Sequence, residues 1–79
     1  MTRSLGEIAY EIDREWERPY FGAVPYLEAM HYLENITDSY GADNASSIVA
    51  YFLANAQTWR GATARRIKAE LNAMLKASK

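Results

Sequence analysis

Cysteine is absent from this sequence of 79 residues, and several other features that often reveal a protein's chemistry are scarce. Without cysteine the chain can form neither a disulfide framework nor a metal site with thiolate ligands. No hydrophobic run approaches the roughly 20 apolar residues that a membrane-spanning helix requires, so we expect no membrane association. The first residues lead directly into an amphipathic pattern, without an apolar signal segment. We therefore expect a cytoplasmic protein.

Histidine occurs only once, at position 31, which leaves little material for catalysis or metal binding. Glu28 and His31 match one of the two Glu-x-x-His elements of a di-iron bundle. Those sites need both elements and two further carboxylates, and only one copy of the element is present here. We expect His31 to be a solvated side chain on the outer face of its helix. The loop Asp38–Asn44 lacks the closing glutamate of a calcium-binding loop, so we interpret it as a turn. We predict that the protein is not an enzyme and carries no metal or other cofactor.

The residues that are present describe an ordinary globular chain. Hydrophobic residues make up 49% and charged residues 24%, which excludes a disordered composition. Six Tyr, two Trp and two Phe can supply much of the buried area of a small core. At this length we expect residues 1–79 to form a single helical domain with a thin core.

Apolar residues recur at helical spacing in four segments, and no segment shows the period-two alternation of a strand. We predict an all-α fold, a compact bundle of four short helices over residues 4–18, 25–36, 44–57 and 61–76. Ser4 and Glu7 fit the capping box that starts a helix. Pro19 disfavours helical backbone at the residue before it and ends the first helix.

The later helices have start signals of their own. Pro25 suits the first turn of the second helix, where its missing N–H does no harm. Gly41 marks a chain reversal, and Asp43 or Asn44 caps the third helix. The fourth helix starts near Gly61.

The third helix is the most apolar, because no residue from Asn44 to Trp59 is charged. Such a helix is usually central in its bundle. Its small residues Ser47, Ala50 and Ala54 form a stripe that another helix could approach closely. That helix is either a neighbour in the same chain or belongs to a second copy, so a homodimer is one of two alternatives.

Charge is divided unevenly along the chain, although the net charge is only −1. Residues 1–43 hold nine acids and three bases, whereas residues 44–79 hold one acid and six bases. One interpretation is that Asp13 and Glu17 on the first helix face Arg65, Lys68 and Lys76 on the last helix. Such pairing would steer the two helices together within the fold.

The alternative interpretation is that the basic fourth helix binds nucleic acid. Arg60, Arg65, Arg66 and Lys68 lie within nine residues, and a helix rich in Arg and Lys is typical of phosphate contact. Two observations oppose it: the isoelectric point is about 5.7, and Arg66 has Glu70 as a ready partner one turn later. DNA binding is therefore the second hypothesis.

Aromatic residues in connecting segments favour protein binding. Tyr20 and Phe21 lie in the linker before the second helix and Tyr26 lies in its first turns. Either these rings cover the small core, or at least one stays exposed as an anchor for a partner. Trp59 and Arg60 form a second candidate patch between the third and fourth helices.

Several strings of the sequence together resemble a family of small proteins encoded by actinobacteriophages. These strings are Ser4–Ala9, Pro19–Leu27, Tyr40–Asp43, Thr58–Gly61 and Arg66–Leu71. The resemblance extends over nearly the whole chain, and it implies a phage product that works in the cytoplasm of an actinobacterial host. By analogy with small phage accessory proteins, we expect a non-enzymatic helical module that binds a host or phage protein.

Overall fold

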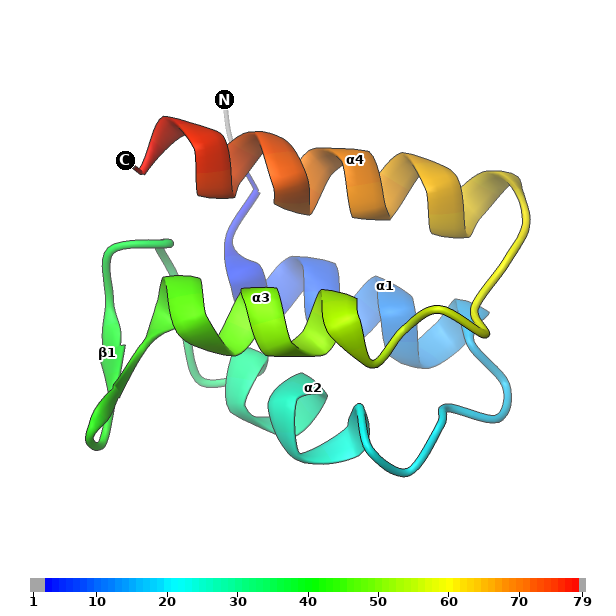
Figure 1. Ribbon diagram of the computed structural model, residues 1–79, viewed down its shortest axis with the longest axis horizontal. Coiled ribbons are helices and arrows are strands. Elements are labelled where there is room, and N and C mark those ends of the chain that lie inside the picture. The colour runs from blue at the N-terminus through cyan, green and yellow to red at the C-terminus, as the bar shows by residue number, and fades with distance from the viewer. Residues whose placement is uncertain (1–2, 79) are drawn as a thin grey trace.

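Four helices and one short hairpin form the fold in the computed structural model, which describes residues 3–78 (Figure 1). In chain order the elements are α1 (Leu5–Glu15), α2 (Val24–Met30), β1 (Ser39–Tyr40), β2 (Asp43–Asn44), α3 (Ala45–Ala54) and α4 (Ala62–Ala77). The predicted four helices are present, but the prediction of an all-α fold is too strict because of the hairpin. Successive helices run in opposite directions in Figure 1, where α1 and α3 lie between α2 and α4.

A capping box begins α1, as the sequence predicts. The Ser4 hydroxyl accepts a hydrogen bond from the Glu7 backbone N–H at 3.1 Å, and the Glu7 carboxylate accepts one from the Ser4 N–H at 2.9 Å. The helix ends at Glu15 and not at the predicted residue 18. Trp16 has an extended backbone that lets its ring enter the core, so the chain leaves the helix before the restriction at Pro19 acts.

The second helix is shorter than predicted, because α2 ends at Met30 and not at residue 36. After Met30, the chain forms backbone hydrogen bonds to the start of α1 in place of those that a longer second helix would form. The N–H groups of Leu5 and Gly6, which have no partner within α1, donate to the carbonyl oxygens of Glu34 and Leu33, each at 2.9 Å. A Cβ at Gly6 would lie only 3.2 Å from the backbone oxygen of His31, so glycine permits the close approach between α1 and the chain after α2.

The hairpin occupies part of the segment that the sequence predicts as a loop. Its antiparallel strands pair Ser39 with Asn44 and Tyr40 with Asp43. Gly41 has a left-handed backbone (φ 62°), which confirms the predicted chain reversal there. Two residues per strand cannot produce a recognisable alternation of polar and apolar side chains, so the pattern did not reveal the strands.

Asp38, directly before the hairpin, forms hydrogen bonds with its carboxylate and with its carbonyl oxygen. Its carboxylate accepts hydrogen bonds from the backbone N–H groups of Asn35 and Glu34, both at 3.0 Å. Its carbonyl oxygen accepts a third, from the Ala45 N–H at 2.7 Å. The hydrogen bonds from Asn35 and Glu34 favour the ionised carboxylate and hold the pKa of Asp38 below its usual range.

The starts of the last two helices follow the sequence signals. The Asn44 side chain accepts a hydrogen bond from the Ser47 N–H at 2.8 Å, so Asn44 is the cap of α3. The Gly61 backbone (φ 113°) lies in a region that L side chains rarely adopt, which explains glycine directly before α4. The predicted end of the third helix at residue 57 is wrong, because α3 ends at Ala54.

Apolar side chains from all four helices meet in one core. The helices α1 and α3 each pack against both α2 and α4. The largest fully buried side chains are Leu5, Ile8, Ile12, Met30, Val49, Phe52, Ile67 and Leu71. The helix α3 also contacts β2 but keeps one face in solvent, where Ala50, Tyr51 and Ala54 lie. Among residues 3–78, no helix has both the length and the apolar character needed to cross a membrane.

Candidate functional site

Four aromatic side chains follow the boundary between α2 and α3, and we call Tyr20, Phe21, Tyr26 and Tyr51 the aromatic seam. The rings of Tyr20 and Phe21 adjoin each other before α2, with centroids 4.8 Å apart. The rings of Tyr26 on α2 and Tyr51 on α3 have centroids 5.4 Å apart. Phe21 is 79% exposed and Tyr51 is 53% exposed, so the seam presents a large apolar surface to solvent.

Gly22 and the Asn55 side chain lie next to the Tyr20 ring. A Cβ at Gly22 would lie 2.6 Å from the Tyr20 ring and 2.8 Å from the Asn55 side-chain oxygen, so both groups rest on this glycine. The Asn55 amide donates a hydrogen bond to the Tyr51 carbonyl oxygen at 2.8 Å. The Ala23 N–H donates to the Tyr20 carbonyl oxygen at 2.8 Å and closes the turn that carries the first pair. Asn55 therefore lies beside Gly22 and the Tyr20 ring and directly follows α3, the helix that carries Tyr51.

An uncharged groove continues the seam at the end of α3. It has a volume of about 290 Å³ and is lined by Tyr20, Ala54, Asn55, Gln57 and Thr58. Charged residues are depleted at the centres of protein interfaces, whereas tyrosine is enriched there. The groove and the seam together have the composition of such a surface.

Of the predicted anchors, Tyr20 and Phe21 pack against each other, whereas Tyr26 packs against Tyr51. Phe21 does not cover the core, whereas Tyr26 is partly buried against it. Tyr51 is not among the residues predicted from the sequence. The sequence did contain a signal for it, because Tyr51 lies on an uncharged helix but outside the arc of its apolar residues. An aromatic residue in such a position faces either a neighbouring helix or solvent.

Trp59 and Arg60, the second predicted patch, differ in their exposure. Trp59 is only 5% exposed, and its indole ring stacks on that of Trp16 with centroids 5.5 Å apart. Trp59 therefore belongs to the core and offers little surface to a partner. Arg60 is exposed at the rim of a groove of about 480 Å³, which Arg18 and Glu17 also line.

Two of the four cations proposed for nucleic-acid binding have partners within the fold. The Lys68 ammonium group donates a hydrogen bond to the Trp59 carbonyl oxygen at 2.6 Å. Burial, and to a smaller extent the charge of Arg60, lowers the pKa of Lys68. The Arg66 guanidinium pairs with Glu11 of α1 at 2.5 Å. Arg65 and Arg60 remain exposed.

The predicted attraction between the first and last helices exists, but different residues carry it. Glu11 pairs with Arg66 and also with Arg3, the latter at 2.7 Å, and Arg3 pairs with Glu70 of α4 at 2.7 Å. Asp13 pairs instead with His31. The expected facing of Asp13 and Glu17 with the basic flank is therefore not found among the ion pairs of residues 3–78. Hydrogen bonds from Arg3 and then Arg66 lower the pKa of Glu11.

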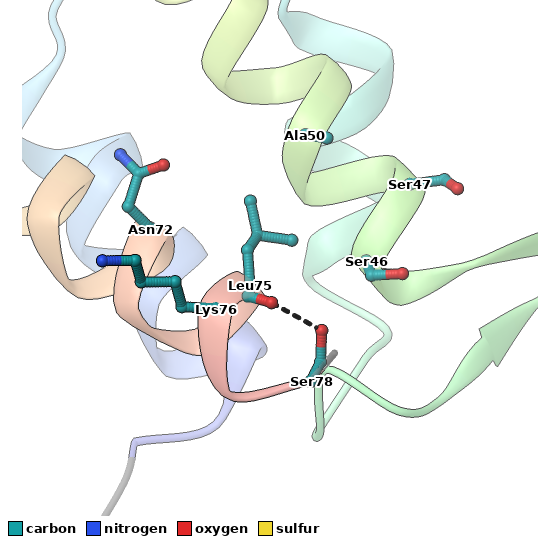
Figure 2. Close-up of a pocket in the computed structure, with 7 residues that line it drawn as sticks. All are labelled: Ser46, Ser47, Ala50, Asn72, Leu75, Lys76 and Ser78. Carbon is teal, nitrogen blue, oxygen red and sulfur yellow. Dashed lines mark hydrogen bonds between the residues drawn. The ribbon is translucent and has the colours of Figure 1, made fainter.

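The predicted stripe of small residues on α3 is divided between two surfaces. Ser47 and Ala50 line a cleft of about 500 Å³ between α3 and the end of α4, whereas Ala54 lines the groove beside Tyr20. In Figure 2 the Leu75 side chain points towards α3 across this cleft, and the Ser78 hydroxyl donates to the Leu75 carbonyl oxygen at 2.8 Å. The neighbouring helix of the same chain therefore approaches α3 without filling the space beside the small residues.

His31 follows α2 and is not the fully solvated side chain that the sequence suggests. Its Nε2 lies 2.5 Å from an oxygen of the Asp13 carboxylate, and its ring meets that of Tyr10 edge-on. The pair links α1 to the end of α2. No group of three or more possible metal ligands occurs among residues 3–78.

Comparisons of the chain with protein-family models, curated proteins and solved structures found no match.

Proposed function

We propose that this protein is a binding module that acts through protein–protein contact at the aromatic seam. The observation that carries the proposal is the exposure of Phe21 beside Tyr20, with Tyr51 and Tyr26 continuing the surface. Burying a phenylalanine side chain contributes about 1.5–3 kcal/mol. The fold forgoes much of this contribution at Phe21, and a partner that covers the ring would gain it.

The surroundings of the seam support a protein partner. The neighbouring groove is uncharged, and the Tyr20 ring packs against Gly22 beside the Asn55 side chain. A preordered aromatic surface loses little side-chain freedom on binding, which favours affinity. We propose no catalytic role, because the seam contains no nucleophile next to a general base.

The partner that we propose is a protein of the bacterial host or of the phage. This part of the proposal rests on the resemblance of the chain to small actinobacteriophage proteins. The proposed place of action is accordingly the host cytoplasm. DNA binding through α4 has weaker support, because Lys68 and Arg66 are engaged with Trp59 and Glu11.

An affinity capture from an actinobacterial lysate, analysed by mass spectrometry, tests the proposal. The wild-type protein is expected to retain a defined protein, and the double variant Phe21→Ala with Tyr51→Ala is expected to lose it. Tyr10→Ala is the matched control, because Tyr10 is 66% exposed on α1 and lies outside the seam. Far-UV circular dichroism and thermal denaturation establish that all variants fold.

Equal capture by the folded double variant would exclude the seam as the binding surface. Light scattering of the purified protein adds a separate readout. If the chain forms a dimer that the same double variant dissociates, the partner at the seam is a second copy of the chain. Salt-sensitive recovery of DNA without any protein would favour the alternative function.

A further inference from the structure

A further groove, which none of the seam residues lines, lies between the end of α2 and the hairpin. It has a volume of about 370 Å³ and is lined by Glu28, His31, Tyr32 and Tyr40. We call it the tyrosine groove. Its chemistry differs from that of the aromatic seam, because a carboxylate accompanies the aromatic rings.

Hydrogen bonds fix the backbone at Tyr32 and near Tyr40. The Tyr32 N–H donates to the Ala29 carbonyl oxygen in the turn that ends α2. Tyr40 belongs to β1 and pairs with Asp43 of β2, while Asp38 fastens the intervening segment. As a result the ring centroids lie 6.2 Å apart with planes inclined by 31°. Tyr32 is 78% exposed, so its ring is open to a ligand.

The charges at the groove favour a cation. The groove-lining residues include Glu28 and neither lysine nor arginine. Among the ion pairs and hydrogen bonds of residues 3–78, none engages the Glu28 carboxylate. His31 contacts the Asp13 carboxylate, and Glu28 is the one acidic residue among those that line the groove. All four groove-lining residues belong to the first 43 residues, which hold nine acids against three bases.

We propose that the tyrosine groove binds an arginine side chain of a partner protein. A cation is attracted to an aromatic face within about 6 Å of the ring centroid. Since the two centroids are 6.2 Å apart, one guanidinium group can satisfy this condition for both Tyr32 and Tyr40. The planar guanidinium also stacks on an aromatic ring and donates two parallel hydrogen bonds to a carboxylate such as that of Glu28, which an ammonium group cannot do.

The inference rests on the proposed function, because it assigns the arginine to a partner protein. It adds a polar contact on a different surface from the seam. The seam would contribute apolar burial, and the tyrosine groove would contribute charge recognition and orientation.

A titration of the full chain with N-acetyl-arginine amide, followed by the NMR signals of Tyr32 and Tyr40, tests the groove directly. The neutral isostere N-acetyl-citrulline amide is the matched ligand control, and choline represents a free organic cation. The arginine compound is expected to bind about two- to fivefold more tightly than the citrulline compound, since cation–π contact at exposed sites has this magnitude. It is also expected to bind more tightly than choline, because choline has no N–H groups that donate to the Glu28 carboxylate. A pentapeptide with one central arginine is expected to bind at least as well.

Three variants separate the contributions of the groove. Glu28→Gln and Tyr32→Leu are each expected to weaken arginine binding about two- to fivefold, whereas Tyr32→Phe keeps the aromatic face and the affinity. Glu15→Gln removes an exposed charge that does not line the groove and is expected to change nothing. Equal binding of the citrulline compound, equal or tighter binding of choline, or full affinity in Glu28→Gln would each overturn the proposal. Because the titration needs no lysate partner, its failure is distinguishable from failure of the seam.

Discussion

The indole ring of Trp16 stacks on that of Trp59, with centroids 5.5 Å apart and planes inclined by only 13°. Trp16 follows the last residue of α1, and Trp59 lies in the connection to α4. The Trp16 ring also meets Phe52 of α3 edge-on, with centroids 6.2 Å apart. This stack therefore joins three of the four helices at one end of the bundle.

Replacing Trp59 by alanine is expected to lower the free energy of unfolding by about 3–5 kcal/mol, because a buried indole leaves a large cavity. A domain of this size has only a few kcal/mol of stability, so the variant should be largely unfolded. Urea denaturation followed by far-UV circular dichroism measures the loss. Arg60→Ala, one residue away and exposed, should stay within about 0.5 kcal/mol of the wild type. Equal stability of the two variants would show that the stack contributes nothing to folding.

The carboxylate of Glu11, between Arg3 and Arg66, is expected to make stability depend on pH. Its pKa is lower in the folded protein than in the unfolded chain. The stabilisation is therefore present above the unfolded pKa of about 4.3 and is lost as pH falls through the lower folded pKa.

Glu11→Gln should accordingly lower the free energy of unfolding at pH 7, by up to about 1 kcal/mol for a partly exposed pair. Its free energy should fall less than that of the wild type between pH 6 and pH 3. Urea denaturation at several pH values measures this slope. The control is Glu15→Gln on the same helix, where no ion pair is present among residues 3–78. Identical slopes for Glu11→Gln and the wild type would contradict the assigned pairing.

The helix starts were predictable because their signals are local. Ser4 with Glu7 and Asn44 with Ser47 form hydrogen bonds within one helical turn, and the residue types alone indicate them. The end of α2 was not predictable in this way. It depends on hydrogen bonds from Leu5 in α1, and nothing within the second segment encodes contact with a residue so distant in sequence.

In the candidate site as well, local features were predictable from the sequence, whereas features that depend on distant residues were not. The exposure of Phe21 could be considered from sequence, since a connecting segment offers little cover. The proximity of Tyr20 to Asn55 at the end of α3 could not, because the two residues are distant in sequence. For Trp59, the sequence showed an aromatic residue in a connection but not the Trp16 ring that buries it.

Substituting Gly22 by alanine is expected to disturb the seam more than the fold. The new Cβ would lie 2.6 Å from the Tyr20 ring and 2.8 Å from the Asn55 side chain, and both groups belong to movable side chains. Their displacement should cost about 1–3 kcal/mol and shift the Asn55 side-chain amide signals in NMR spectra. Capture of the seam partner should weaken in parallel. Unchanged Asn55 signals would contradict the described contact.

Lys68 and Arg65 are expected to respond differently to neutralisation, which separates a structural cation from a surface cation. Lys68→Gln removes the hydrogen bond to the Trp59 carbonyl oxygen and should lower the free energy of unfolding by about 1 kcal/mol. Arg65→Gln should change it by less than about 0.5 kcal/mol, since Arg65 is exposed. If α4 instead binds DNA, both substitutions should reduce retention on duplex DNA at low salt to a similar degree. Urea denaturation together with DNA retention at two salt concentrations distinguishes these outcomes, because the stability loss at Lys68 alone follows from its hydrogen bond to the Trp59 carbonyl oxygen.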